Sequence, residues 1–146
     1  MMSDQSCEIA AYNPPSEEIE AILQKYRIVA VVGLSPKPER ASHQVAKYLK
    51  EKDYTIVPVN PGQKNILGEK CYPDLKAIPF PVDVVDIFRK PDAVPPIVDD
   101  AIEIGAKAVW MQLGIVNNGA AEKAREAGLE VVMDRCMKVE HMSMTK

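Results

Sequence analysis

Cysteine and histidine are scarce in this sequence, and their spacing excludes two common ways of stabilising a small fold. The three cysteines are Cys7, Cys71 and Cys136, and the two histidines are His43 and His141. The cysteine number is odd, and no Cys-x-x-Cys pair or Cys/His cluster occurs. We therefore expect neither a disulfide framework nor a structural zinc site, and we predict no metal site.

Long apolar runs and an excess of positive charge are also missing. No segment approaches the roughly 20 apolar residues that a membrane-spanning helix needs. The polar, acidic N-terminus lacks the apolar core of a signal peptide. The net charge is −3, without a basic tail or a Lys/Arg stripe. We therefore expect a cytoplasmic protein with neither nucleic acid nor membrane as a partner.

What remains is the composition of a single globular domain. The chain has 146 residues, of which 47% are hydrophobic, and this is enough to bury a core without crosslinks. Residues 1–15 are predicted to be a flexible lead-in that ends in two prolines. Residues 16–146 are predicted to form the domain.

Strand-like and helix-like segments alternate through this domain. Short runs rich in β-branched residues predict strands at 28–33, 54–59, 82–88, 106–111 and 129–133. Helical patterns occur at 16–25, 42–52, 92–104 and 118–127, with a turn or two at 73–78 and a short C-terminal helix in MKVEHMSM. The alternation predicts a single α/β domain of the Rossmann-like, doubly wound class, with a five-stranded parallel sheet.

Several residues are predicted to mark helix ends. Ser16 and Ser42 stand where an N-cap is expected, because a serine hydroxyl can accept a bond from the first turn. Gly105 and Gly128 stand just before strands, where a helix commonly ends in a left-handed residue.

The loop after the first strand, GLSPKPERASHQV, is the clearest candidate for ligand binding. Gly33 permits a tight turn and a close approach of the backbone, and the next helix presents its positive N-terminus. Ser35 supplies a hydroxyl, and Lys37 and Arg40 supply cations. We expect an anionic group here, although any strand–helix turn of this kind needs a glycine or a cap whether or not a ligand binds.

The common dinucleotide signature is absent from this loop. Positions two and five after Gly33 are Ser35 and Pro38, so no Gly-x-Gly-x-x-Gly occurs. The second strand ends at Val59–Pro61 without the carboxylate that binds a free ribose in NAD enzymes. Lys64 follows instead. A cation there suits a phosphorylated ribose, as in coenzyme A or NADP. The alternative is a solvated loop lysine without a ligand.

Four stretches of this chain together resemble a known family. They are GLSPKPERASHQVAKYL, VPVNPGQKNILGEKCYPDL, VDVVDIFRKPDAV and AVWMQLGIVNNGAAEKAREAGLEVVMDRCMKVEH. In order and spacing they resemble the small CoA-binding proteins related to the N-terminal domain of the succinyl-CoA synthetase alpha subunit, over residues 16–141. The resemblance implies coenzyme A or acyl-CoA as the ligand, lying across the strand ends.

Carried onto this chain, the resemblance and the strand ends together give one set of predicted cofactor-binding residues. The phosphates are expected near Gly33 and Ser35, the nucleotide end near Asn60 and Lys64, and the pantetheine arm near Trp110. A core position for Trp110 is an equally good interpretation. The full set is Gly33, Leu34, Ser35, Lys37, Arg40, Ser42, Val59, Asn60, Pro61, Lys64, Phe88, Arg89, Lys90, Trp110, Gln112 and Gly114.

No catalytic residue is predicted. The synthetase needs a phosphorylatable histidine from a second domain and a separate nucleotide-binding subunit, and we expect this chain to have neither. It is expected to bind CoA or acyl-CoA as a carrier, sensor or regulatory module. The alternative is an enzyme that uses NAD(P), or a CoA-thioester enzyme that uses Cys136 or His141. A homodimer is the expected assembly for a small protein of this type.

Overall fold

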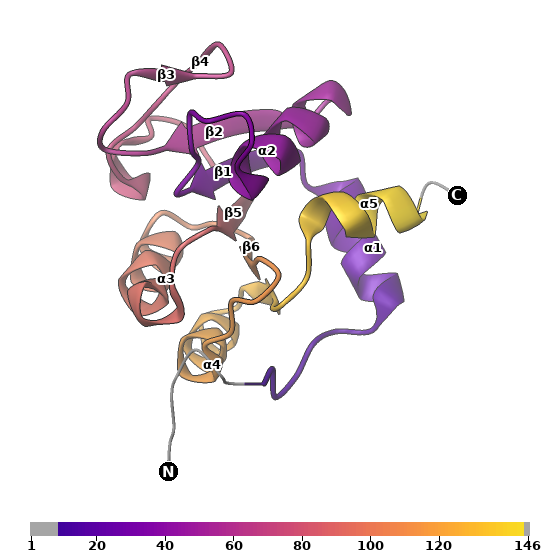
Figure 1. Ribbon diagram of the computed structural model, residues 1–146. Coiled ribbons are helices and arrows are strands. Elements are labelled where there is room, and N and C mark those ends of the chain that lie inside the picture. The colour runs from indigo at the N-terminus through magenta and orange to yellow at the C-terminus, as the bar shows by residue number, and fades with distance from the viewer. Residues whose placement is uncertain (1–8, 145–146) are drawn as a thin grey trace.

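The computed structural model describes residues 9–144 and contains one five-stranded sheet, and Figure 1 shows its helices and strands. The strands, in spatial order, are β2 (Thr55–Val59), β1 (Ile28–Val32), β5 (Val84–Ile87), β6 (Ala108–Met111) and β7 (Glu130–Val132). All neighbouring pairs are parallel. The predicted α/β, Rossmann-like class with five parallel strands is confirmed.

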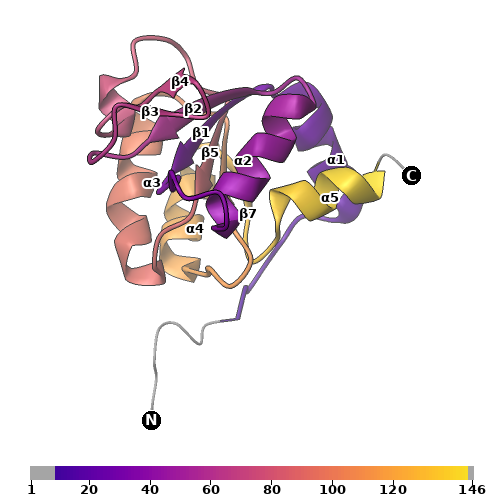
Figure 2. The same ribbon diagram turned by 45° about the horizontal axis from the view of Figure 1, so that its top comes forward.

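Helices cover both faces of the sheet (Figure 2). On one face lie α1 (Ser16–Lys25), α2 (Ala41–Glu51) and α5 (Met137–Met144). On the other face lie α3 (Val94–Glu103), α4 (Asn118–Glu126) and the short 3-10 helix η2 (Leu75–Ala77). Strand β1 is apolar on both faces of the sheet. Val29 and Val31 pack on the first face and Ala30 and Val32 on the second, and all four are buried.

The segment between β2 and β5 departs most from the prediction. A small hairpin, β3 (Asn65–Ile66) with β4 (Glu69–Lys70), occupies part of it and was not predicted, because two residues are too few for a strand pattern. The turn or two of helix predicted at 73–78 is present as the single 3-10 turn η2. A second 3-10 turn, η3 (Pro91–Ala93), precedes α3.

Neither predicted serine cap is correct. Helix α1 begins at Ser16 with Pro15 as its N-cap, and α2 has Arg40 as its N-cap, in both cases without a side-chain capping bond. The Ser42 hydroxyl instead accepts the Ser35 N–H at 3.0 Å, which folds the preceding loop back onto the helix. Ser42 therefore lies two residues after the N-cap, too far into the helix to cap it.

The two predicted C-terminal glycines are confirmed. Gly105 and Gly128 follow α3 and α4 with φ angles of 77° and 93°, a conformation that residues with a side chain adopt only with strain.

Part of the predicted lead-in is held against the sheet edge. Residues 1–8 lie outside the described residues, and residues 9–15 run past α4 to α1 (Figure 1). The Asn13 side chain donates to the Met133 carbonyl at 2.8 Å and accepts the Met133 N–H at 2.7 Å. The Ala11 N–H donates to Asn118 at 2.8 Å. Asn13 thus pairs with the backbone at the end of edge strand β7 as a neighbouring strand would.

Within residues 9–144, no helix is both long enough and apolar enough to cross a membrane. The same residues contain no group of three or more histidine, cysteine or acidic side chains placed to hold a metal ion. Cys71 and Cys136 are free thiols, and Cys7 lies outside the described residues.

Candidate functional site

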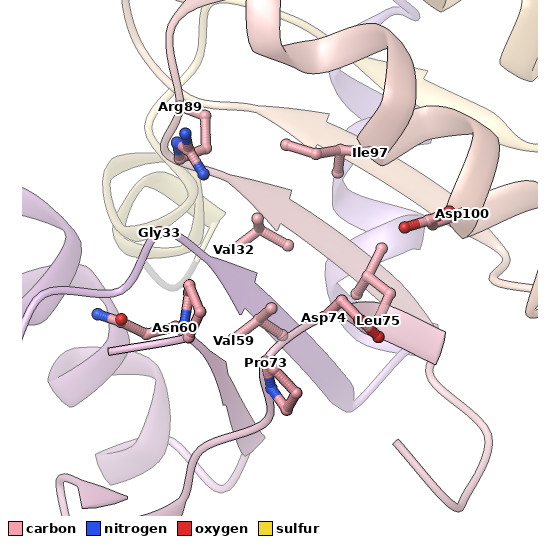
Figure 3. Close-up of a pocket in the computed structure, with 11 residues that line it drawn as sticks. Val32, Gly33, Val59, Asn60, Pro73, Asp74, Leu75, Arg89, Ile97 and Asp100 are labelled. Atoms are coloured by element: carbon pink, nitrogen blue, oxygen red, sulfur yellow. The ribbon is translucent and has the colours of Figure 1, made fainter. Parts of the chain in front are cut away.

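The strand order creates a crevice at the carboxyl ends of β1, β2 and β5. From β1 the chain crosses to β2 on one side, and it later returns to β5 on the other, so the connecting segments separate there. A cavity of about 420 Å³ lies at this point (Figure 3). Its lining residues are Val32, Gly33, Val59, Asn60, Pro61, Pro73, Asp74, Leu75, Arg89, Ile97 and Asp100.

A second, smaller cavity of about 230 Å³ meets the first at Gly33 and lies at the start of α2. It is lined by Gly33, Ser35, Arg40, Ala41, Ser42 and Phe88. Because no side chain caps α2, the N–H groups of its first turn remain available to an anion. The helix dipole and the Arg40 guanidinium add positive charge to this cavity.

Gly33 lines both cavities, and its backbone lies so close to the end of β5 that a side chain there would not fit. Its φ angle is 88°, and an added Cβ would lie 2.6 Å from the Phe88 carbonyl oxygen and 2.9 Å from Cδ of Arg89. The Gly33 N–H donates to the Val59 carbonyl at 3.0 Å. The glycine therefore brings the ends of β1, β2 and β5 together, and its N–H is already used within the protein.

Local hydrogen bonds order the loop between Gly33 and α2. The Ser35 hydroxyl accepts the Lys37 N–H at 3.1 Å, and the His43 Nδ1 lies 2.9 Å from the Ser35 carbonyl. Together with the bond from the Ser35 N–H to the Ser42 hydroxyl, these contacts fix the wall of the smaller cavity before any ligand arrives. Such a preformed wall lowers the conformational entropy lost on binding.

Asn60 holds the same loop from the side of β2. Its Nδ2 donates to the Leu34 carbonyl at 2.9 Å, and its Oδ1 accepts the Gly62 N–H at 2.8 Å. Both ends of this amide are thus engaged within the protein, so Asn60 is a positioning residue that also lines the larger cavity.

The predicted site residues divide into three groups. Those that line the larger cavity are Gly33, Val59, Asn60, Pro61 and Arg89. Those that line the smaller cavity are Gly33, Ser35, Arg40, Ser42 and Phe88. Those that line neither are Leu34, Lys37, Lys64, Lys90, Trp110, Gln112 and Gly114. Of this last group Lys37, Lys64 and Lys90 are exposed cations near the same edge.

Trp110 lies in the core, as the alternative interpretation expects. It is fully buried on the face covered by α1, α2 and α5, and its Nε1 donates to the Arg135 carbonyl at 2.9 Å. Leu34 is also fully buried. Gln112 is 3% exposed, and its Oε1 accepts the Met137 N–H at 3.2 Å. Trp110 and Gln112 therefore hold the segment that leads into α5 through these two hydrogen bonds.

Several lining residues were missed in the sequence. Pro73, Asp74 and Leu75 enter the larger cavity from the segment at η2, and Ile97 and Asp100 enter from α3. The spacing of three between Ile97 and Asp100 places them on one face of a helix, which was the only available signal. The larger cavity therefore contains two carboxylates, although the end of β2 itself supplies none.

The side chains considered for thioester chemistry do not line either cavity. His141 is 6% exposed, and its Nδ1 lies 2.7 Å from the Tyr48 hydroxyl. Burial lowers the pKa of His141, and the charges of Lys52 and Arg27 lower it further. Cys136 is partly buried just before α5.

Comparison with known proteins gives close relatives over nearly the whole chain. The uncharacterized protein YneT of Bacillus subtilis is 42% identical over 129 residues, which are 88% of this chain and 96% of YneT. A solved structure of a hypothetical protein from Pyrococcus horikoshii is 43% identical with a TM-score of 0.90, and the match covers 99% of this chain and 100% of that one.

A more distant relative is a multidomain enzyme. Acetate–CoA ligase [ADP-forming] I of Archaeoglobus fulgidus is 28% identical over 121 residues, which are 76% of this chain but only 18% of that enzyme. The family described as "CoA binding domain" matches residues 27–142, which include both cavities. The chain belongs to this CoA-binding domain family, as the resemblance in its sequence predicts.

Proposed function

We propose that this protein binds coenzyme A or an acyl-CoA at the two joined cavities, as a carrier, sensor or regulatory module. The proposal depends on one observation: the smaller cavity is positively charged and the larger cavity has apolar walls. The uncapped start of α2 and Arg40 make the smaller cavity positive, which suits the pyrophosphate. The larger cavity has the apolar walls that suit a nucleoside. Family membership supports the same ligand.

The exposed cations at the rim suit the remaining charge of the ligand. Lys64 lies in the loop after β2, beyond the larger cavity, and its side chain is exposed. A flexible lysine in this position can reach a ribose phosphate that points out of the cavity. This arrangement keeps the ribose phosphate of CoA away from Asp74 and Asp100 inside it.

The proposal is tested by isothermal titration with CoA, dephospho-CoA, acetyl-CoA and NAD. We expect CoA to bind, and dephospho-CoA to bind several-fold more weakly because it lacks the phosphate near Lys64. A Lys64→Ala variant should bind CoA and dephospho-CoA equally. Tighter binding of acetyl-CoA than of CoA would identify the acyl group as the signal. No binding of any CoA form would refute the proposal.

One observation favours a second candidate, a nicotinamide dinucleotide. Asp74 and Asp100 are carboxylates in the cavity that the end of β2 lines, and a carboxylate that follows this strand binds the free ribose hydroxyls of NAD in dinucleotide-binding folds. The same titration decides between the two, because NAD would then bind more tightly than CoA.

A further inference from the structure

The larger cavity has polar groups at its two ends and apolar walls between them. Figure 3 shows Arg89 and Asn60 on the Gly33 side, and Asp74 and Asp100 on the opposite side. The walls between are formed by Val32, Val59, Leu75 and Ile97. An occupant that fits this order has an anionic end at Gly33, a flat apolar body and a hydrogen-bond donor at its far edge.

The adenosine part of a nucleotide has these three features in this order. Its 5′-phosphates leave toward the α2 N-terminus, its ring is flat and apolar on both faces, and the exocyclic amine lies at the far edge. An ionised carboxylate only accepts hydrogen bonds, so the carboxylates at the far end are suited to an amine and not to a ring carbonyl oxygen.

Of the two carboxylates, Asp100 is the freer. Asp74 is the N-cap of η2, and its Oδ1 accepts the Ala77 N–H at 2.9 Å. Asp100 has a looser partner, because its Oδ1 lies 3.8 Å from the Lys76 ammonium in a half-exposed ion pair. Such a pair contributes little to stability and can rearrange when a ligand enters.

We infer that Asp100 determines base specificity by accepting a hydrogen bond from the exocyclic amine of adenine. The inference rests on the proposed function, since it places the nucleotide end of CoA in the larger cavity. It assigns a recognition role to a residue of α3, whereas the other contacts proposed for CoA come from the strand ends and α2.

Two nucleotides that differ only in the amine test this role. ADP and purine riboside 5′-diphosphate are titrated into the wild-type protein and into Asp100→Ala. The wild type should bind ADP on the order of tenfold more tightly, the effect of one charge-assisted hydrogen bond. In Asp100→Ala the two nucleotides should bind equally, because the acceptor is gone.

The neighbouring acid provides the matched control. Asp99 lies on the same helix, lines neither cavity and pairs with Lys123 at 2.6 Å. Asp99→Ala should keep the tenfold preference for ADP. Equal binding of the two nucleotides to the wild type overturns the inference. So does an equal loss of both in Asp100→Ala, which would indicate that Asp100 contacts the ribose.

The failure of this inference is distinguishable from the failure of the proposed function. If the wild type binds neither CoA nor ADP, the proposed function itself fails. If it binds both but the amine makes no difference, the nucleotide site stands and only the role of Asp100 is wrong.

Discussion

At the scale of single residues, the buried carboxyl of Asp86 is expected to destabilise the sheet in which it lies. It is fully buried in β5 between Val31 and Trp110, and neither carboxyl oxygen has a hydrogen-bond partner among the described residues. Burial raises the pKa of this carboxyl well above its ordinary value of 3.8. The folded protein therefore holds a proton on Asp86 over a pH range in which the unfolded chain releases it.

Replacing Asp86 with asparagine should make stability less dependent on pH. With the folded pKa above 3.8, the contribution of Asp86 is fully present below pH 3.8 and falls as pH rises toward the folded pKa. Asp86→Asn removes this loss, so the variant should gain on the wild type as the pH rises from 3.8 toward the folded pKa of Asp86. Denaturant unfolding across this range measures the difference. A constant difference would show that Asp86 does not titrate as we expect.

A methyl group at Gly33 should destabilise the fold more than a methyl group at another glycine of the same conformation. In Gly33→Ala the new Cβ would lie 2.6 Å from the Phe88 carbonyl, and the φ angle of 88° adds strain. We expect a loss of about 2–4 kcal/mol, from strain and overpacking together. Gly128→Ala has a φ of 93° but no atom within 4 Å, so about 1 kcal/mol is expected. Equal losses would rule out the steric explanation.

At the scale of elements, the sequence predicted what depends on long patterns and missed what depends on contacts between segments. The five strands and the main helices follow from runs of apolar residues such as Val29–Val32. The hairpin β3–β4 has two residues per strand, and the position of Ser42 is decided by a bond to Ser35 across the loop. No local pattern contains that information, so neither the hairpin nor the position of Ser42 could be predicted from the sequence.

The two hydrogen bonds between Asn13 and the Met133 backbone should protect the edge of the sheet at β7. Asn13→Ala leaves the N–H and carbonyl of Met133 without their partners, which should cost about 1–3 kcal/mol. The exposed edge should also increase self-association. Chemical unfolding and analytical ultracentrifugation measure the two effects. Asn65→Ala, at an exposed asparagine in β3, is the control and should change neither.

The docking of α5 should weaken as the pH falls. Because the pKa of His141 is lowered below 6.5 in the folded state, the unfolded chain takes up the proton first as the pH drops through 6.5. Stability contributed by neutral His141 is then lost down to the folded pKa. His141→Phe keeps a ring between Tyr48 and Tyr54 but does not titrate.

The comparison is made by unfolding at pH 7 and at pH 5. At pH 7 the His141→Phe variant should be about 1 kcal/mol less stable, because the bond to Tyr48 is lost. Between pH 7 and pH 5 it should lose less stability than the wild type. A parallel loss in both proteins would mean that other groups cause the pH dependence.

At the scale of the whole molecule, the sequence located the sheet edge at which the candidate site lies but not all of the segments that line it. The strand ends at Gly33, Asn60 and Arg89 were predictable, because parallel strands bring their carboxyl ends to one edge. Asp74 and Asp100 come from the N-cap of η2 and from α3, which lie on one face of the sheet. Their approach depends on how η2 and α3 pack on the sheet, which a single sequence does not contain.

The cavities are formed jointly by β1, β2, β5, α2 and α3, so occupation should stabilise the molecule as one unit. At a CoA concentration 100 times the dissociation constant, the free energy of unfolding should rise by about 2.7 kcal/mol. For a chain of this size that corresponds to an increase in Tm of roughly 5–10 °C.

Arg40→Ala should lose most of this increase at the same CoA concentration, because the cation of the smaller cavity is gone. Lys47→Ala, an exposed lysine of the same helix that lines neither of the two joined cavities, should keep it. If Arg40→Ala were stabilised as much as the wild type, the phosphates would bind elsewhere and the smaller cavity would have another occupant.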